Sequence, residues 1–403
     1  MALIIFLISL CLIALSVPVL FFCLEVFLGL KRGGRVLTPV ETTEPVSSII
    51  LIPAHNEASV IEQTLADLKT ECQPELDHVL VVADNCSDST ANLAAQLGAE
   101  VIERFNDKQR GKGFALDYAL KHLADTGCEP DVIVIFDADC RFVTGSLEQL
   151  KSACYRLNRP VQSAYRLQAQ EGAGISTRIA EFAIRVKNLI RNRGLVLMGF
   201  PAVLTGTGMA FPYQALKQVQ LASAELAEDM KLGVDLTLAG YPASYLDSSE
   251  VLSDLPLSGA ATSTQRERWE HGHLTVMKTY LPELFKKAVQ QRSRLLLGTL
   301  LDLSIPPLSL LVLVSLAVCA VSFLFGILSG TLSVILYALV LMTLLVSTVL
   351  VAWWHQGRDL LSGNDLLKLP LFVLSKLGLY RRFFNKPQTT WVRTARDKED
   401  HKP

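Results

Sequence analysis

The sequence predicts an α/β protein in which a mostly parallel sheet carries helices on both faces and is attached to transmembrane and interfacial helices. Between residues 48 and 139, short apolar runs alternate with helical patterns, which is the order of a doubly wound sheet. Charged residues gather where those runs end. Of the 403 residues, 50% are hydrophobic and only 19% are charged, so we also expect membrane segments.

The central strand of this pattern is predicted at residues 132–136, which are all apolar and mostly β-branched. It ends in Asp137-Ala-Asp139. Open α/β sheets bind ligands at the carboxyl ends of their strands, and magnesium at phosphate sites is held by one or two carboxylates. The two acids therefore indicate a metal–phosphate site, although an acidic turn after a strand would have the same sequence.

The other elements of this half follow from apolar runs, helical spacing and capping residues. In chain order they are a strand at 48–52, a helix at 59–69, a strand at 78–82, a helix at 88–97, a strand at 101–102 and a helix at 110–123. Glu57, Asp84 and Lys112 stand where a strand ends or a helix begins, so we expect them to line one crevice with the two central acids. The first strand is not followed by Gly-x-Gly-x-x-Gly, which disfavours hydride transfer with a dinucleotide.

The second half supplies a long helix at 176–193, a Gly/Pro-rich loop at 200–211 and an amphipathic helix at 226–239. Glu228 and Asp229 begin the last of these, where acids also suit the helix dipole. The functional interpretation is that Asp229 is a general base at the mouth of the crevice. Gln265-Arg-Glu-Arg268-Trp269 offers an arginine for phosphate and a tryptophan face for a sugar, although an interfacial helix has a similar composition.

Three segments are apolar and long enough to span a membrane, at residues 2–24, 303–328 and 332–354. Basic residues after the first (Lys31, Arg32, Arg35) and near the C-terminus (Arg381, Arg382, Lys386, Arg393) indicate that the region between the first two spans is cytoplasmic. Residues 281–294 and 366–380 carry basic residues among apolar ones and predict interfacial helices. The inner or plasma membrane is the expected location.

Composition narrows the function further. A net charge of −1 argues against nucleic acid as a partner. The eight cysteines form no Cys-x-x-Cys pair, so a disulfide framework or zinc site is not expected and a reducing compartment fits. His271 and His273 lack a nearby third ligand, and we interpret them as polar surface or hydrogen-bonding residues.

The order and spacing of five motifs resemble membrane-bound family 2 glycosyltransferases, in the branch that holds cellulose, chitin-oligosaccharide and hyaluronan synthases. The resemblance implies the GT-A fold of nucleotide-diphospho-sugar transferases. It departs from relatives at the second strand, which ends Ala83-Asp84 where relatives often have two acids. The motifs are Pro53-Ala-His-Asn-Glu57, Asp84, Asp137-Ala-Asp139, Glu228-Asp229 and Gln265-Arg-Glu-Arg268-Trp269.

On the donor side, the resemblance implies that Glu57 and Asp84 contact the base and ribose, with Lys112 near the same nucleotide. Asp137 would hold the nucleotide. Asp139 would bind a divalent cation, Mg²⁺ or Mn²⁺, that bridges the diphosphate.

On the acceptor side, the resemblance implies that Asp229, with Glu228 beside it, deprotonates the acceptor hydroxyl. Gln265 and Arg268 would hold the diphosphate leaving group. Trp269 would stack on the acceptor.

The sequence thus predicts a metal-dependent, inverting hexosyltransferase-type enzyme that moves a sugar from a nucleotide sugar, with a UDP-sugar expected, to a growing polysaccharide or lipid-linked saccharide at the membrane. The alternatives are direct transfer to a ceramide or polyprenyl phosphate, and a transporter or scaffold with a degenerate nucleotide domain. Three spans are few for a secretion channel unless the chain is a homo-oligomer. The expected domains are an anchor (1–30), a GT-A domain (45–280), interfacial and membrane helices (281–385) and a cytoplasmic tail (386–403).

Overall fold

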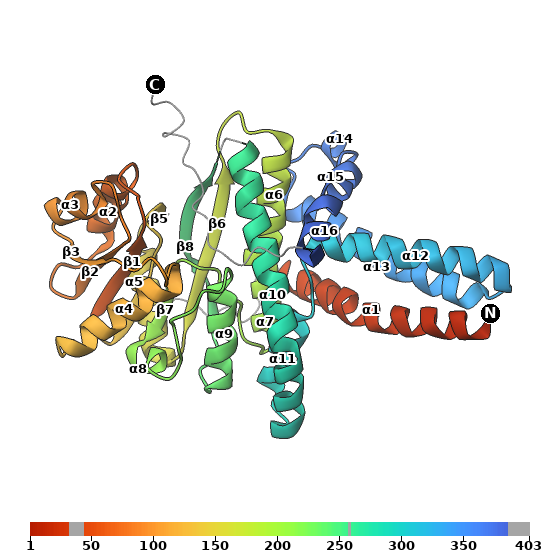
Figure 1. Cartoon of the computed structure of the whole chain (residues 1–403), viewed down its shortest axis with the longest axis horizontal. Coiled ribbons are helices and arrows are strands. Elements are labelled where there is room, and N and C mark those ends of the chain that lie inside the picture. Colours follow the sequence, from red (N-terminus) through yellow and green to blue (C-terminus); the bar gives the residue numbers. More distant parts are fainter. Residues whose placement is uncertain (32–43, 257–258, 386–403) are drawn as a thin grey trace.

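The computed structural model describes residues 1–31, 44–256 and 259–385, with the side chains of 259–264 excepted. The expected basic residues Arg32, Arg35, Lys386 and Arg393, and the expected tail, lie outside the described residues. A sheet with helices on both faces forms one end of the molecule, and three long helices project from the other end (Figure 1).

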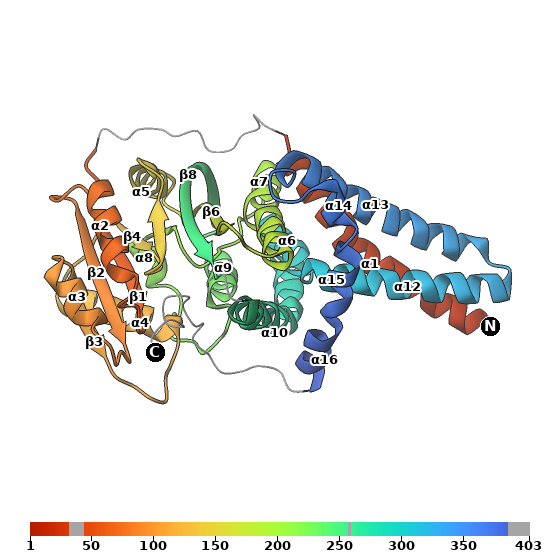
Figure 2. The ribbon, with the colours of Figure 1, turned by 90° about the horizontal axis from the view of Figure 1, so that it is seen from above.

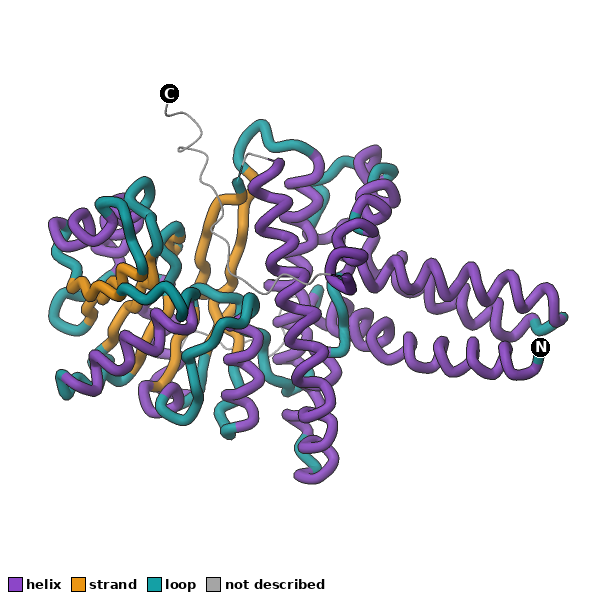
Figure 3. Tube along the Cα trace, viewed as in Figure 1, coloured by secondary structure: helices purple, strands orange, loops and turns teal. Residues whose placement is uncertain are grey.

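Eight strands form one mixed sheet in the order β3-β2-β1-β4-β7-β6-β8-β5 (Figure 3). The pairs β1–β2, β1–β4, β2–β3 and β6–β8 are parallel, whereas β7 is antiparallel to both of its neighbours and β5 is antiparallel to β8. The mostly parallel α/β prediction is confirmed. The strands are β1 (Ser48–Ala54), β2 (Asp77–Asp84), β3 (Glu100–Arg104), β4 (Val132–Ile135), β5 (Cys140–Phe142), β6 (Val161–Ala169), β7 (Met209–Pro212) and β8 (Ser244–Leu255).

The central strands are apolar on both sides because both faces of the sheet are covered. In β1, Ile49 and Leu51 join one core cluster, while Ile50 and Ile52 join a second cluster on the opposite face. Packing on both faces fixes the register of β1, and with it the position of the loop that carries Glu57. The helices of this region are α2 (Ile61–Glu71), α3 (Thr90–Gln96), α4 (Lys112–Asp125), α5 (Ser146–Leu157), α6 (Ile175–Arg185), α7 (Asn192–Leu197), α8 (Tyr213–Leu216) and α9 (Glu228–Leu238).

Several predicted elements differ from the structure. The loop predicted at 200–211 ends in strand β7, because its last residues pair with β4. The helix predicted at 176–193 is α6 and α7 joined by a π-helical segment, η1 (Val186–Arg191). The separate helix predicted at 281–294 is wrong. Those residues mostly complete α10 (Gly259–Gln291), which ends just before Arg292 at φ 49° and is followed by α11 (Arg294–Leu303).

Among the residues that the structure describes, three helices are long and apolar enough to cross a membrane: α1 (Ala2–Gly29), α12 (Leu308–Ser329) and α13 (Leu332–Gln356). They run side by side away from the sheet (Figures 1 and 2). Residues 366–380 do not form a further span among the described residues. They belong to the short helices α14 (Gly363–Leu366), α15 (Leu369–Ser375) and α16 (Leu377–Asn385).

The membrane helices are joined rigidly to the sheet region. A Cβ on Gly29 would lie 1.8 Å from the carbonyl oxygen of Ile190, and one on Gly194 would lie 2.1 Å from that of Glu25. Glycine is therefore needed on both sides of this crossing. Arg191 completes the joint by donating to Glu25 and to Asp302, each at 2.6 Å.

Candidate active site

A cavity of about 750 Å³ opens at the edge of the sheet where β1, β2 and β4 end. All ten residues singled out in the sequence line it, although they come from positions 57 to 269 of the chain. The acids at the strand ends and those at the start of α9 therefore share one hollow. The ten are Glu57, Asp84, Lys112, Asp137, Asp139, Glu228, Asp229, Gln265, Arg268 and Trp269.

Lys112 lies at the centre of this charge cluster. It is the first residue of α4, and its Nζ donates to Asp137 Oδ1 at 2.5 Å and to the Gly206 carbonyl at 2.6 Å. Burial would lower the pKa of Lys112, but attraction to Asp137 and Glu228 outweighs it and the pKa is raised. Burial also raises the pKa of Asp137, against the pull of Lys112. The lysine thus offsets part of the carboxylate charge at this edge.

Asp137, Asp139 and Cys140 place one potential ligand atom each within 4.8 Å of one another. Burial raises the pKa of the Cys140 thiol well above its usual value, so the sulfur stays protonated, and it lies 3.6 Å from Asp139 Oδ1. Two carboxylates without a thiolate match the oxygen preference of Mg²⁺ and Mn²⁺. The donor set therefore fits a hard divalent cation.

Glu228 and Asp229 begin α9 and face Lys112 across the cavity. The backbone N–H of Met230 donates to Asp229 Oδ1 at 2.8 Å, which fixes the carboxylate at the helix start. Burial, and then repulsion from Asp229, raise the pKa of Glu228 to about 7. Gly206 passes close by with φ 95°, and a Cβ there would lie 3.6 Å from Asp229 Oδ2. The Gly-rich loop thus brings backbone directly against the two acids.

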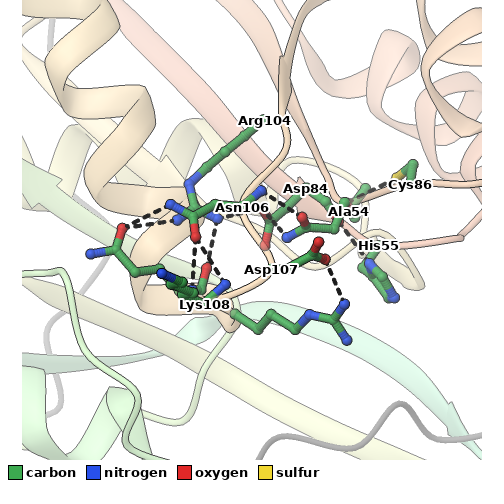
Figure 4. A network of polar contacts seen from close by, with 11 residues as sticks. Ala54, His55, Asp84, Cys86, Arg104, Asn106, Asp107 and Lys108 are labelled. Carbon is green, nitrogen blue, oxygen red and sulfur yellow. Dashed lines mark hydrogen bonds and ion pairs between the residues drawn. The ribbon is translucent and has the colours of Figure 1, made fainter.

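Asp84 is held in a polar network that the sequence did not predict (Figure 4). Its Oδ1 accepts from Arg104 Nη1 at 2.6 Å and from Asn85 Nδ2 at 2.9 Å, and both charged side chains are buried. His55 Nδ1 lies 2.7 Å from the Asp84 carbonyl oxygen. Arg104 ends the neighbouring strand β3, so only the pairing of β2 with β3 brings it to Asp84. This network stiffens the floor of the cavity next to Glu57.

Gln265, Arg268 and Trp269 lie on α10, as the helical spacing predicted. The helix is held by the C-terminal helices, and this contact includes Glu270 and Lys376, which themselves line the cavity. Glu270 accepts from Lys376 Nζ at 2.5 Å and from the Tyr380 hydroxyl, and Glu267 accepts two hydrogen bonds from Arg382. These hydrogen bonds to the C-terminal helices fix the orientation of α10, and with it the position of the residues that line the cavity.

The cavity also has polar residues that the sequence analysis did not single out, notably Lys187 and His273. His271 and His273 are both buried, so the surface interpretation is wrong; His271 Nε2 lies 3.2 Å from the Leu379 carbonyl oxygen, in line with the hydrogen-bonding interpretation. The His-x-His spacing was the available signal for His273. Lys187 was one of several basic residues on a long helix, and nothing in the sequence separated it from the others.

Residues 45–272 match the family described as Glycosyltransferase like family 2. The chain is 23% identical over 256 residues to glucomannan 4-beta-mannosyltransferase 7 of Arabidopsis thaliana, covering 59% of this chain and 44% of that one. It is 24% identical over 253 residues to the probable glycosyltransferase YdaM of Bacillus subtilis, covering 59% and 57%. The chain spans about half the length of these curated relatives.

Among solved structures, the mannosyltransferase PcManGT from Pyrobaculum calidifontis, in complex with GDP-Man and Mn²⁺, superposes with a TM-score of 0.55. It is 16% identical and covers 87% of this chain and 99% of its own. The two proteins share a fold.

Proposed function

The chain belongs to glycosyltransferase-like family 2, and from that premise we propose that it transfers a sugar from a nucleotide-diphosphate donor to a hydroxyl of a membrane-associated acceptor, with inversion. The observation that carries the proposal is the cavity in which Asp137, Asp139 and Asp229 meet. One general base and one charged donor site suffice for a single displacement, unlike the two carboxylates flanking the bond in glycoside hydrolases.

The donor lies across the strand ends. Glu57 and Asp84 face its base and ribose, and Asp137 with Lys112 faces the nucleotide. Asp139 would hold a divalent cation, which would supply positive charge to the diphosphate. Gln265 and Arg268 on α10 reach the same diphosphate from the opposite wall. GDP-Man accompanies Mn²⁺ in the solved relative, and a UDP-sugar is the donor expected from the sequence.

The acceptor hydroxyl approaches between Asp229 and Trp269. Its oxygen forms a bond to the anomeric carbon while the carbon–oxygen bond to the diphosphate breaks, and the electron pair leaves on the phosphate oxygen. The hydroxyl proton passes to Asp229, whose carboxylate is fixed by the Met230 N–H. Arg268 offsets the charge that develops on the leaving group. Glu228 lies beside the base, and its raised pKa of about 7 makes the charge next to Asp229 depend on pH near neutrality.

The basic residues that flank the membrane helices favour the cytoplasmic face as the location of this chemistry. The proposed domains are an anchor of residues 1–30, a GT-A domain of 45–280 and a membrane part of 281–385. The site is compatible with chain elongation like that of the cellulose-synthase branch and with a single addition to a lipid-linked saccharide.

The test is nucleoside diphosphate release by purified protein with Mn²⁺ and a panel of nucleotide sugars that includes GDP-mannose and UDP-glucose. We expect Asp229→Asn to lower turnover by about 10²- to 10⁴-fold. Asp235→Asn is the matched control on the same helix, where the carboxylate pairs with Lys231 outside the cavity. Release that is equal in both variants, or absent with every donor, would refute the assignment.

The metal assignment has a separate test. Asp139→Asn should raise the Mn²⁺ concentration needed for half-maximal release by about tenfold or more, because one of the two carboxylates is lost. Full activity in the presence of a chelator would contradict the role of Asp139.

A further inference from the structure

The cavity does not end at the strand edge. Beyond Asp229 its lining continues onto the membrane helices α12 and α13 and onto α15, and there it is mostly aliphatic and aromatic, with Ser309 and Lys376 as polar members. Figure 2 shows α15 alongside α12 at the junction with the sheet region. We call this part the apolar arm and define it by Val312, Leu316, Leu345, Val346, Leu350 and Phe372.

The apolar arm reaches the outer surface of the membrane helices. Leu316 is 47% exposed, Val346 46% and Leu350 43%, and all three line the cavity. They lie within two of the three helices that are apolar enough to cross a membrane. The arm is therefore open to the hydrocarbon layer, and a molecule can enter the site from the lipid.

The lining of the arm selects its occupant. A polysaccharide chain carries hydroxyls on every residue, and these would lose their hydrogen bonds against aliphatic side chains. A hydrocarbon chain has no hydrogen bonds to lose there, and it passes from lipid into a lining that is also apolar. The arm thus suits the tail of a lipid better than a glycan.

Two polar side chains lie where the apolar arm meets the catalytic acids. Among the described residues Lys187 forms no salt bridge, although it lies in the cavity and near enough to Asp229 to feel its charge. His273 is 8% exposed, and its Nε2 has no hydrogen-bond partner among the described residues. Lys187 belongs to the π-helical segment η1, a geometry frequent at functional sites. A partly buried cation that forms no salt bridge with the described residues, close to an unsatisfied imidazole, indicates an anionic group in the bound ligand.

We propose that the apolar arm holds the hydrocarbon chain of a lipid-linked saccharide acceptor, with its phosphate beside Lys187 and His273 and its sugar hydroxyl at Asp229. The inference rests on the proposed function and narrows its acceptor to a phosphate-bearing lipid. It also gives the membrane helices a role in substrate binding besides anchoring.

The first test measures transfer in phosphatidylcholine nanodiscs, with a donor that supports nucleoside diphosphate release. The acceptors are a monosaccharide linked through diphosphate to a polyprenyl chain and the same headgroup on a methyl group. Val346→Trp fills the apolar arm, and Val340→Trp on the same helix projects into lipid as the matched control, since Val340 is exposed and does not line the cavity.

We expect Val346→Trp to lower the ratio of lipid transfer to donor hydrolysis by about tenfold or more, with Val340→Trp like the wild type. We also expect the methyl acceptor to be poorer by a similar factor. Equal ratios in the two tryptophan variants, or equal use of the two acceptors, would overturn the assignment of the arm. Donor hydrolysis would persist in that case, whereas loss of all nucleotide release would instead refute the proposed function.

The second test concerns the phosphate. Lys187→Gln should lower kcat/KM by about tenfold or more for the diphosphate-linked acceptor, because a charge-assisted contact is lost. It should have a much smaller effect on the same sugar joined to the same chain by a neutral glycosidic bond. An equal loss with both acceptors would show that Lys187 does not face the headgroup anion.

Discussion

Lys112→Met tests whether one ammonium group balances the acids of the cavity. Its Nζ lies 2.5 Å from Asp137 Oδ1, and the two side chains are 16% and 33% exposed. Breaking a fully buried pair costs about 3–5 kcal/mol, and the remaining exposure of Asp137 reduces this to about 2 kcal/mol. Lys121→Met on the same helix is the control, because the Lys121 side chain is 71% exposed where it pairs with Asp117. Such surface pairs contribute under about 1 kcal/mol to the free energy of unfolding.

The assay is thermal unfolding of ligand-free protein with and without Mn²⁺. A loss of about 2 kcal/mol corresponds to a Tm lower by roughly 4–8 °C in Lys112→Met, with little change in Lys121→Met. Mn²⁺ should stabilise Lys112→Met more than the wild type, because a cation then replaces the missing ammonium among four carboxylates. Equal Tm values in the two variants, or an equal Mn²⁺ increment in Lys112→Met and wild type, would refute the charge-balance argument.

Two further perturbations probe the proton balance and the membrane joint. The pKa of Glu228, raised to about 7, means that the folded protein holds a proton that the unfolded chain releases above about pH 4.5, so stability falls as pH rises through that window. Glu228→Gln should therefore raise the free energy of unfolding of ligand-free protein by up to about 3 kcal/mol at pH 8, seen as a higher Tm, and leave both little changed at pH 5. An equal change in Tm at the two pH values would count against this direction of the pH dependence. Gly194→Ala puts a Cβ 2.1 Å from the Glu25 carbonyl oxygen and should lower the free energy of unfolding by about 1–3 kcal/mol or more. Gly363→Ala is the control, because a Cβ there meets nothing within 4 Å. Matching melting curves for the two variants would show that helix α1 does not pack so closely.

The sequence predicted the parallel half of the sheet well because its signals are local. The run that ends at Asp137 is apolar on both faces, and the loop with Glu57 follows a similar run. Strands β6, β7 and β8 were not predicted, since β7 contains Pro212 and follows a Gly/Pro-rich loop, and β8 carries polar residues at about half of its positions. Their strand state depends on pairing with each other and with β4.

The site shows the same difference between features with a local signal in the sequence and features that depend on contacts between distant segments. The strand ends and the helix starts of an α/β fold carry charged residues that can be recognised along the chain, which is why seven of the ten were named in advance. Gln265, Arg268 and Trp269 lie within α10 and were named from their residue types and helical spacing. Asp84 was named without Arg104, because only the pairing of β2 with β3 makes them neighbours. Lys187 was not recognised, and His273 was named but not assigned to the cavity, since burial next to an open cavity has no signature in the residues themselves.

By itself, the sequence determined the family motifs, the membrane segments and the chemistry available at the sheet edge, because these depend on short runs and on hydrophobic length. The tertiary structure decided that the catalytic cavity continues between α12 and α13 into an aliphatic arm. That continuity depends on the docking of α1 against η1 and α7 through close glycine contacts and on the ion pairs of Arg191 with Glu25 and Asp302. Contacts between residues more than a hundred positions apart set it, and no local pattern along the chain encodes them.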